Sequence, residues 1–242
     1  MIWFPGLGES KNKALVSLGM SCQTTHQLRR LTDLQQESDL SSELITPSGP
    51  FDWLICPPAS AIDLLHKRIP EFTKSSIHIR KGRPYWADLN IYFWHSFLVT
   101  DQGERFLDID ATFEREIKRW RYLRDQFSRL DPSRTVFIIS NTQNNLETEV
   151  FDKSERDQYH FTNTELDALR HSLAEYFCTK ANDIHLEIVT REERSSGLEA
   201  RGVTKKGVSF LPLDQNEWKG SKQSWNKWWQ QLNQSLADQH SN

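Results

Sequence analysis

The segment KALVSLGMSC, residues 13–22, places an apolar run directly before a glycine turn and a cysteine. An apolar run without alternation is typical of a strand buried on both faces, so we predict a central strand over residues 13–18. Gly19 allows the chain to turn, and a predicted helix over residues 21–32 follows. This pattern predicts that Cys22 lies at the N-terminus of that helix.

The predicted position of Cys22 is compatible with two roles. Backbone N–H groups at a helix N-terminus lack partners and the helix dipole favours negative charge, which stabilises a thiolate and makes a cysteine nucleophilic. A free cysteine is also often a small buried apolar residue. Position alone therefore leaves a reactive and a structural interpretation of Cys22 open.

Length and composition describe a globular protein. The chain has 242 residues, of which 37% are hydrophobic and 26% are charged, and its mean hydropathy is −0.66. This length is sufficient for one large domain with a substantial core. We expect a single α/β domain over residues 1–242, with loose ends at 1–12 and 237–242.

Hydrophobic patterning and net charge limit the expected partners and location. The longest apolar runs are only strand-sized and the first residues lack the features of a secretory signal, so we expect a cytoplasmic protein without membrane contact. The net charge of −3 argues against general nucleic-acid binding. Nothing in the sequence indicates an oligomeric state.

The three cysteines, Cys22, Cys56 and Cys178, are too few and too dispersed for a disulfide framework. We expect reduced thiols. No Cys-x-x-Cys spacing suggests zinc, so neither a metal nor another cofactor is expected.

The rest of the chain alternates between helical and strand patterns. A long polar loop is predicted at 33–50. The predicted helices are 59–68, 111–130, 163–180 and 221–236, and the predicted strands are 77–80, 90–99, 135–139, 184–190 and 208–213. This alternation predicts an α/β fold, namely a three-layer α/β/α sandwich with a mostly parallel sheet.

Apolar side chains at helical spacing give two packing predictions. The helix over 111–130 carries an apolar stripe from Phe113 to Leu130, which we expect to pack on the parallel sheet. Near the C-terminus, we expect Trp225 and either Trp228 or Trp229 to face the body of the protein.

Cys22, Asp52 and His95 supply a thiol, a carboxylate and an imidazole, which are the groups needed for a nucleophile, an orienting acid and a base. His26 is a competing base, because it lies four residues after Cys22 and hence on the same helix face. A polar cluster at 141–145 follows the strand 135–139, where open α/β sheets build binding sites.

Several motifs together resemble a known family. They are Val16 to Cys22 (VSLGMSC), Pro50 to Trp53 (PFDW) and Phe93 to Phe97 (FWHSF). In this order they are similar to the motifs of a largely uncharacterised, mostly bacterial family labelled papain-like cysteine peptidases. The resemblance covers residues 13–139 and implies that Cys22 is the nucleophile, His95 the base and Asp52 the third member. Ser96 stands where that family often has an acidic residue after the histidine.

Two functions of different classes follow from these observations. The first is a cysteine-dependent hydrolase or acyl transferase of peptidase type, in which Cys22 attacks a carbonyl and His95 transfers the proton. The second is a non-catalytic or glycan-related binding or transferase protein that uses the same cleft. In that case Asp52 and the residues 141–145 would contact a sugar. The substrate class, whether small molecule, glycan or peptide, is left open.

Overall fold

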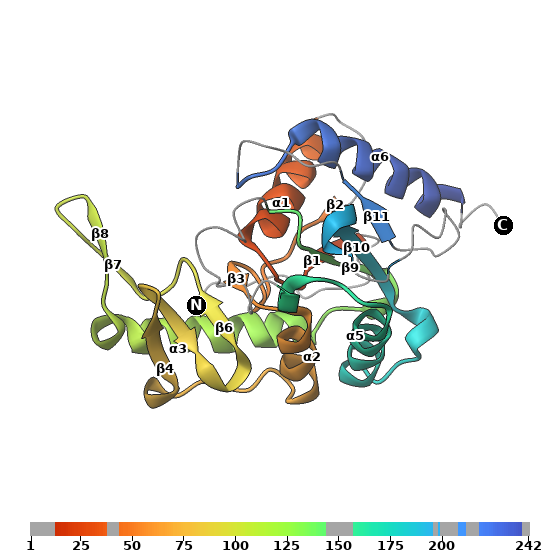
Figure 1. The fold of residues 1–242 in the computed structure, drawn as a ribbon. Helices are drawn as coiled ribbons and strands as arrows, with labels where there is room; N and C mark the ends of the chain where they lie inside the picture. Colours follow the sequence, from red (N-terminus) through yellow and green to blue (C-terminus); the bar gives the residue numbers. More distant parts are fainter. Residues whose placement is uncertain are drawn as a thin grey trace, which may run out of the picture.

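The computed structural model describes residues 13–37, 44–143, 157–195, 198, 208–211 and 218–238. Five parallel strands form a sheet in the order β11-β10-β9-β1-β2 (Figure 1). Their bounds are Lys13–Ser17 (β1), Leu44–Ile45 (β2), Thr135–Ser140 (β9), His185–Thr190 (β10) and Val208–Phe210 (β11). The chain is thus of the α/β class, and the prediction that four of these segments share a parallel sheet is confirmed.

The principal helices lie close to their predicted positions. They are Cys22–Glu37 (α1), Pro58–His66 (α2), Ile109–Ser128 (α3), Asn163–Tyr176 (α5) and Lys222–Asp238 (α6). Helix α1 continues past the predicted end at residue 32. Its last turn is mostly polar and does not have to be covered by other apolar side chains, and even the leucine in it, Leu34, is 44% exposed. The N-cap of α5 is Thr162, which forms a capping box with Glu165.

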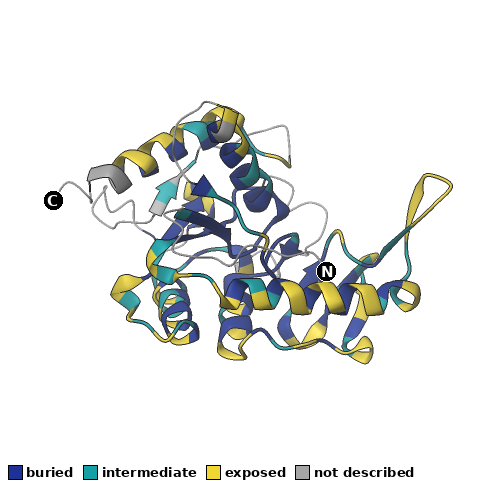
Figure 2. Ribbon diagram, turned by 180° about the vertical axis from the view of Figure 1, so that it is seen from behind, coloured by how far each residue is buried: buried dark blue, intermediate teal, exposed yellow. Residues whose placement is uncertain are grey.

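The two faces of the parallel sheet are covered by different helices. On one face, Leu15 packs in a cluster with Leu28 of α1 and Trp228 of α6. On the other face, Val16 and Phe137 belong to a larger cluster that includes residues of α2, α3 and α5. Figure 2 shows the resulting band of buried residues along the sheet. Burial on both faces explains why β1 is almost wholly apolar.

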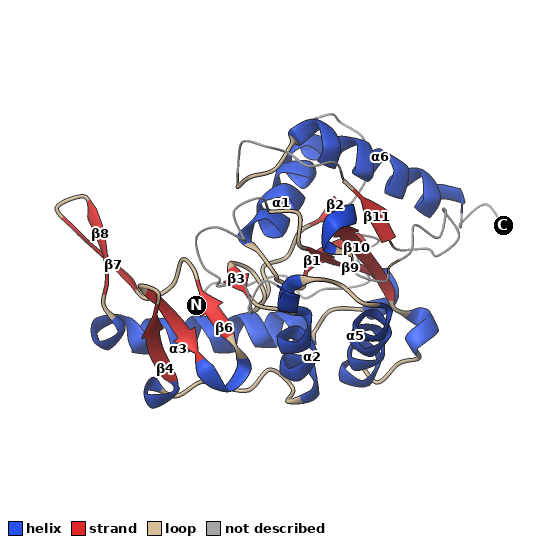
Figure 3. Cartoon of the chain, viewed as in Figure 1, coloured by secondary structure: helices blue, strands red, loops and turns tan. Residues whose placement is uncertain are grey.

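A second sheet, which is antiparallel, lies beside the parallel one (Figure 3). It has the order β3-β6-β5-β4, with bounds Leu54–Ile55 (β3), Ile77–Arg80 (β4), Arg83–Trp86 (β5) and Ile91–Phe93 (β6). A separate hairpin follows, made of Leu98–Asp101 (β7) and Glu104–Leu107 (β8). The sequence analysis predicted only part of this sheet, because its strands are two to four residues long and two of them, β4 and β5, contain charged residues.

The prediction of one strand over 90–99 is wrong. Strand β6 ends at Phe93 and β7 begins at Leu98, and Phe97 between them has a positive φ of 63°. A left-handed residue cannot continue an extended strand. His95 therefore lies in a bend between two sheets and not within a strand.

Helix α3 packs chiefly on the antiparallel sheet, which corrects the expectation that it lies on the parallel one. The Trp120 ring is 6.0 Å from both Trp86 and Phe93. Only the last turns reach the parallel sheet, where Phe127 lies 6.1 Å from Phe137. The apolar stripe was identified correctly, but such a stripe does not specify which sheet it covers.

The predicted burial of the C-terminal tryptophans is confirmed: Trp225 and Trp228 are each 1% exposed and Trp229 is 8% exposed. Their rings form a contiguous aromatic group, with Trp225 and Trp228 5.3 Å apart. Within the described ranges, no helix is both long enough and apolar enough to cross a membrane.

We predict that Trp228→Ala lowers the free energy of unfolding by about 3–5 kcal/mol, because it leaves a cavity between α6 and the sheet. Urea denaturation measures this change. The matched control is Tyr122→Ala, since Tyr122 is 56% exposed on α3 and its loss should change stability by less than about 0.5 kcal/mol. Equal effects of the two substitutions would mean that α6 does not pack on the sheet.

Candidate functional site

The turn between β1 and α1 is tight and left-handed at two consecutive residues. Gly19 has φ of 85° and Met20, which is fully buried, has φ of 66°. A Cβ on Gly19 would lie 3.0 Å from the Cys56 sulfur, so only glycine fits. A non-glycine residue in this region costs about 1–3 kcal/mol, and such strain is concentrated at functional sites. The turn delivers Cys22 as the first residue of α1.

Sheet topology also marks this turn as a place for a site. From β1 the chain goes to β2 on one side and then returns to β9 on the other, so the direction of strand order reverses between β1 and β9. Open parallel sheets bind ligands at the carboxyl ends of the strands that flank such a reversal. Cys22 follows β1 and Asn141 follows β9 at this edge.

Cys22 is a buried thiol in this structure, with 2% of its surface exposed. The pKa of the thiol is raised to about 12, chiefly by burial and to a smaller extent by the Asp52 carboxyl, although a hydrogen bond with its own backbone and the charge of Arg83 lower it. At neutral pH the thiol is therefore protonated. Helix position alone does not activate Cys22.

Two hydroxyl groups beside Cys22 are left without partners. Ser21 and Thr24 are fully buried, and neither side-chain oxygen has a hydrogen-bond partner within the described part of the chain. Buried hydroxyls are ordinarily paired, because leaving one unpaired costs about 1–3 kcal/mol. Together with the first N–H groups of α1, these hydroxyls are donors available to a polar group bound next to the thiol.

The Asp52 carboxylate connects the turn at 49–52 to helix α1. It accepts hydrogen bonds from Thr25 Oγ1 at 3.1 Å, from Arg29 Nη2 at 2.8 Å and from the Gly49 N–H at 3.2 Å. Burial raises the pKa of this carboxyl, while the Arg29 charge and the three hydrogen bonds oppose that rise. Asp52 thus positions α1, and it makes no hydrogen bond to His95.

His95 is exposed in the bend after β6, and its ring lies edge-on to Trp53 with centroids 5.4 Å apart. Partial burial lowers the pKa of the imidazole, and the charges of Arg83 and Arg105 lower it further. The ring is consequently neutral at pH 7 and able to accept a proton. Among the described residues it has no hydrogen bond to Cys22.

The structure thus brings the three predicted site residues into one neighbourhood without joining them. Asp52 acts on the pKa of Cys22, Arg83 acts on both Cys22 and His95, and Trp53 connects the Asp52 turn to the His95 ring. That Cys22, Asp52 and His95 act together in catalysis stays a prediction.

The competing base, His26, faces a different part of the chain. Its ring is 5.4 Å from Trp218, and burial together with the nearby charges of Lys219, Arg30 and Lys222 lowers its pKa. It makes no hydrogen bond to Cys22 among the residues that the structure describes. His26 packs α1 against the segment 218–220.

Amide side chains that the sequence analysis missed fill the crevice between β1 and β9. Gln23 accepts a hydrogen bond from the Thr142 hydroxyl and donates to the Trp218 carbonyl at 2.8 Å. Gln27 donates to the carbonyls of Lys219 and Gly220. No local sequence signal predicts these contacts, because the partners lie in distant segments.

The predicted polar cluster at 141–145 is partly structural. The Asn141 amide donates to the carbonyls of Tyr159 and Arg194 and accepts from the Thr190 hydroxyl at 2.7 Å. These bonds use the whole amide, so Asn141 fixes the strand ends and is not available to a sugar. Residues 144 and 145 lie outside the described residues.

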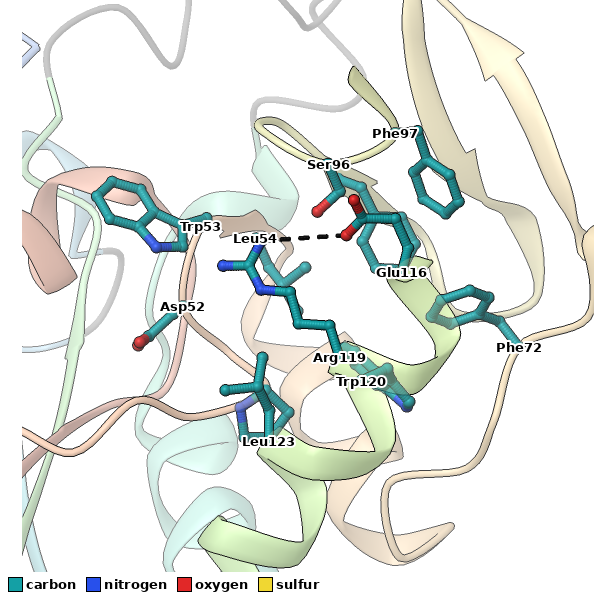
Figure 4. Close-up of a pocket in the computed structure, with 12 residues that line it drawn as sticks. Asp52, Trp53, Leu54, Phe72, Ser96, Phe97, Glu116, Arg119, Trp120 and Leu123 are labelled. Carbon is teal, nitrogen blue, oxygen red and sulfur yellow. Dashed lines mark ion pairs between the residues drawn. The ribbon is translucent and has the colours of Figure 1, made fainter. Parts of the chain in front are cut away.

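A small pocket lies on the α3 side of Trp53 (Figure 4). The Arg119 side chain crosses it with its guanidinium group near Trp53 and Ser96, and an ion pair of 4.0 Å joins it to the buried Glu116 carboxylate. Aromatic rings, including Phe72 and Trp120, form its wall. The pocket borders the His95 bend, and its Glu116 carboxylate is paired more closely with Arg115, at 2.7 Å, than with Arg119.

Within the described ranges, no group of three His, Cys, Asp or Glu side chains is arranged to hold a metal ion. No protein-family model, curated protein or solved structure matches the chain. The resemblance to papain-like peptidases therefore rests on the quoted motifs alone.

We expect iodoacetamide at pH 7.5 to label Cys178 faster than Cys22. Cys178 is exposed, whereas Cys22 is buried with its pKa raised to about 12, so its reactive thiolate is scarce. Peptide mass spectrometry of a labelling time course measures both rates, with the buried Cys56 as an internal control. Faster labelling of Cys22 than of Cys178 would show that the thiolate is stabilised in solution.

Asp52→Asn is expected to lower the free energy of unfolding by about 1–3 kcal/mol, because the amide leaves the Arg29 contact without its negative partner and presents a donor to other donors. Thermal or urea unfolding measures the change. Asp63→Asn is the control, since Asp63 is exposed on α2. Unchanged stability would contradict a role for Asp52 in holding α1.

Proposed function

We propose that the chain is a cysteine-dependent hydrolase or acyl transferase with Cys22 as its nucleophile. The observation that carries the proposal is the placement of Cys22: it is the first residue of α1, after a strained turn, at the β1–β9 reversal of a parallel sheet. The unpaired hydroxyls of Ser21 and Thr24 next to it support a polar reacting group at this position.

In the proposed reaction the Cys22 sulfur attacks a carbonyl carbon of the substrate and forms a thioester. The thiol proton passes to the neutral His95 imidazole, which then protonates the leaving group. N–H groups at the start of α1, near residues 21–23, stabilise the oxyanion. Water, or another acceptor in a transferase, then cleaves the carbon–sulfur bond and restores the thiol.

This mechanism requires His95 to approach the sulfur when substrate binds. The imidazole lies in a bend outside both sheets, and among the described residues it makes no side-chain hydrogen bond or ion pair that would have to break. Catalytic hydrogen bonds are often long in unliganded enzymes and shorten in the complex. Asp52 contributes by holding α1, through Thr25 and Arg29, and not by orienting the base.

A second candidate is a non-catalytic or glycan-related binding protein that uses the same cleft. Two features favour it: the pKa of Cys22 is raised to about 12, and no hydrogen bond links its sulfur to a base within the described residues. Under this alternative, Cys22 only packs the core and the donors at the start of α1 hold a ligand.

Other predictions accompany the proposal. Separate apolar clusters on the two faces of the parallel sheet support a three-layer α/β/α sandwich. Membership of the papain-like family, a single domain and a cytoplasmic location stay predictions.

We expect p-nitrophenyl acetate to acetylate Cys22, with release of p-nitrophenolate and a mass increase on the Cys22 peptide. Cys22→Ala should lose this product, and His95→Gln should slow its formation by about 10²–10⁴-fold, because the glutamine cannot accept the thiol proton. Mass spectrometry and absorbance measure the two products.

The control is Cys178→Ala, which should acetylate Cys22 at the wild-type rate. Acetylation confined to Cys178, or unaffected by the His95 substitution, would remove the support for catalysis and favour the binding alternative.

A further inference from the structure

Three large residues come together at one end of the antiparallel sheet. Tyr85 pairs with Tyr92 between β5 and β6, so two residues further along Arg83 lies opposite Trp94. Trp53, directly before β3, accepts a hydrogen bond from the Trp94 N–H at 3.4 Å, but its φ of 65° takes it out of the extended strand. Directly opposed residues point to the same face of a sheet. We call Arg83, Trp94 and Trp53 the cross-strand row.

The guanidinium group of Arg83 is held by an aromatic face and not by a carboxylate. Its central carbon lies 4.2 Å from the centroid of the Trp94 ring. Among the described residues Arg83 forms neither an ion pair nor a side-chain hydrogen bond. A guanidinium group stacked in this way keeps its N–H edge free, and that edge matches the two oxygens of a carboxylate or phosphate.

The other cation on the row is already neutralised. Arg29 lies 5.5 Å from the Trp53 ring centroid, but its guanidinium group is paired with Asp52 at 2.8 Å. This contrast identifies Arg83 as the cation available to a ligand.

Electrostatic effects show that the charge of Arg83 reaches the proposed reaction centre. The same guanidinium group lowers the pKa of Cys22 and of His95, so its charge acts on both side chains. Arg105 on β8 adds further positive charge that acts on His95. An anionic group bound at Arg83 would therefore change the electrostatic environment of the thiol and the imidazole.

We propose that the cross-strand row recognises an oxyanionic group of the substrate, a carboxylate or a phosphate, which the free edge of Arg83 binds while the reacting carbonyl lies at Cys22. The indole ring of Trp94 holds the guanidinium group in place, and the Trp53 ring covers the adjoining apolar part of the substrate. This inference rests on the proposed function for the identity of the reacting group, but anion binding by the row does not require it.

Binding of simple anions tests the proposal without any reaction. Succinate and inorganic phosphate are titrated at constant ionic strength, with succinamide as the neutral analogue of succinate, and binding is followed by tryptophan fluorescence and calorimetry. Constant ionic strength is needed because salt screens exposed charges. We expect at least one of the two anions to bind at least 10-fold more tightly than succinamide, and their relative affinities distinguish a carboxylate from a phosphate site.

Arg83→Met should weaken anion binding at least 10-fold, and Arg83→Lys should restore only part of it, because lysine keeps the charge without the planar fork. Arg68→Met is the matched control: Arg68 lies over another ring, Tyr176, at 5.0 Å, and its loss should leave anion affinity unchanged. Thermal unfolding of each variant verifies that it is folded. Wild-type affinity in Arg83→Met, or equal binding of the anions and succinamide, would overturn the proposal.

A second readout separates this inference from the proposed function. If Cys22 is acylated, the wild-type protein should react faster with 4-nitrophenyl hydrogen succinate than with p-nitrophenyl acetate, and Arg83→Met should abolish that preference. If anions bind at Arg83 but Cys22 is never acylated, the proposed function fails and the binding inference holds. If Cys22 is acylated but the protein neither prefers the anionic ester nor binds anions, the proposed function holds and the binding inference fails.

Discussion

The left-handed turn at Gly19 and Met20 determines where helix α1 starts and in which direction it leaves the sheet. The turn is compact because the Leu18 N–H bonds to Ile138 in β9 and Gly19 lies against Cys56 and Phe51. Any Cβ at Gly19 would separate these segments. The same contact brings the Phe51–Trp53 stretch, and with it the antiparallel sheet, against the end of β1. Both the position of Cys22 and the approach of the second sheet depend on this single small residue.

The two sheets therefore contribute different residues to the candidate site. The parallel sheet supplies Cys22 after a strand that is covered on both faces, whereas the antiparallel sheet supplies Arg83 from β5, Trp53 directly before β3 and Trp94 directly after β6. His95 belongs to neither sheet, since it lies in the bend after β6. In many enzymes the final catalytic geometry forms only with substrate.

Sequence patterns predicted the parallel sheet because its signals are local. Four of its strands are mainly apolar segments, as in Thr135–Ser140, and its helices have apolar stripes. The two-residue strand β2 was missed, because Leu44–Ile45 lies within the stretch 33–50 that was predicted as a loop. The antiparallel sheet was predicted only in part, because short strands such as Arg83–Trp86 mix charged and aromatic residues and gain their stability from pairing. The grouping of Cys22, Asp52 and His95 in one cleft stays a prediction, and the bonds of Asp52 to Thr25 and Arg29 depend on tertiary packing that no spacing encodes. In the sequence, the only indication that Asp52 lies in a turn was the presence of turn-forming residues before it, including Gly49 and Pro50.

The contact between α1 and α6 has a consequence for synthesis of the chain. Leu28 and Leu31 of α1 are covered by Trp225 and Trp228, which lie near the end of the sequence, and Gln23 and Gln27 bind the carbonyls of the segment 218–220. The ribosome releases α1 well before α6. The part of the apolar face of α1 that α6 covers therefore stays uncovered until α6 has been synthesised and has left the exit tunnel.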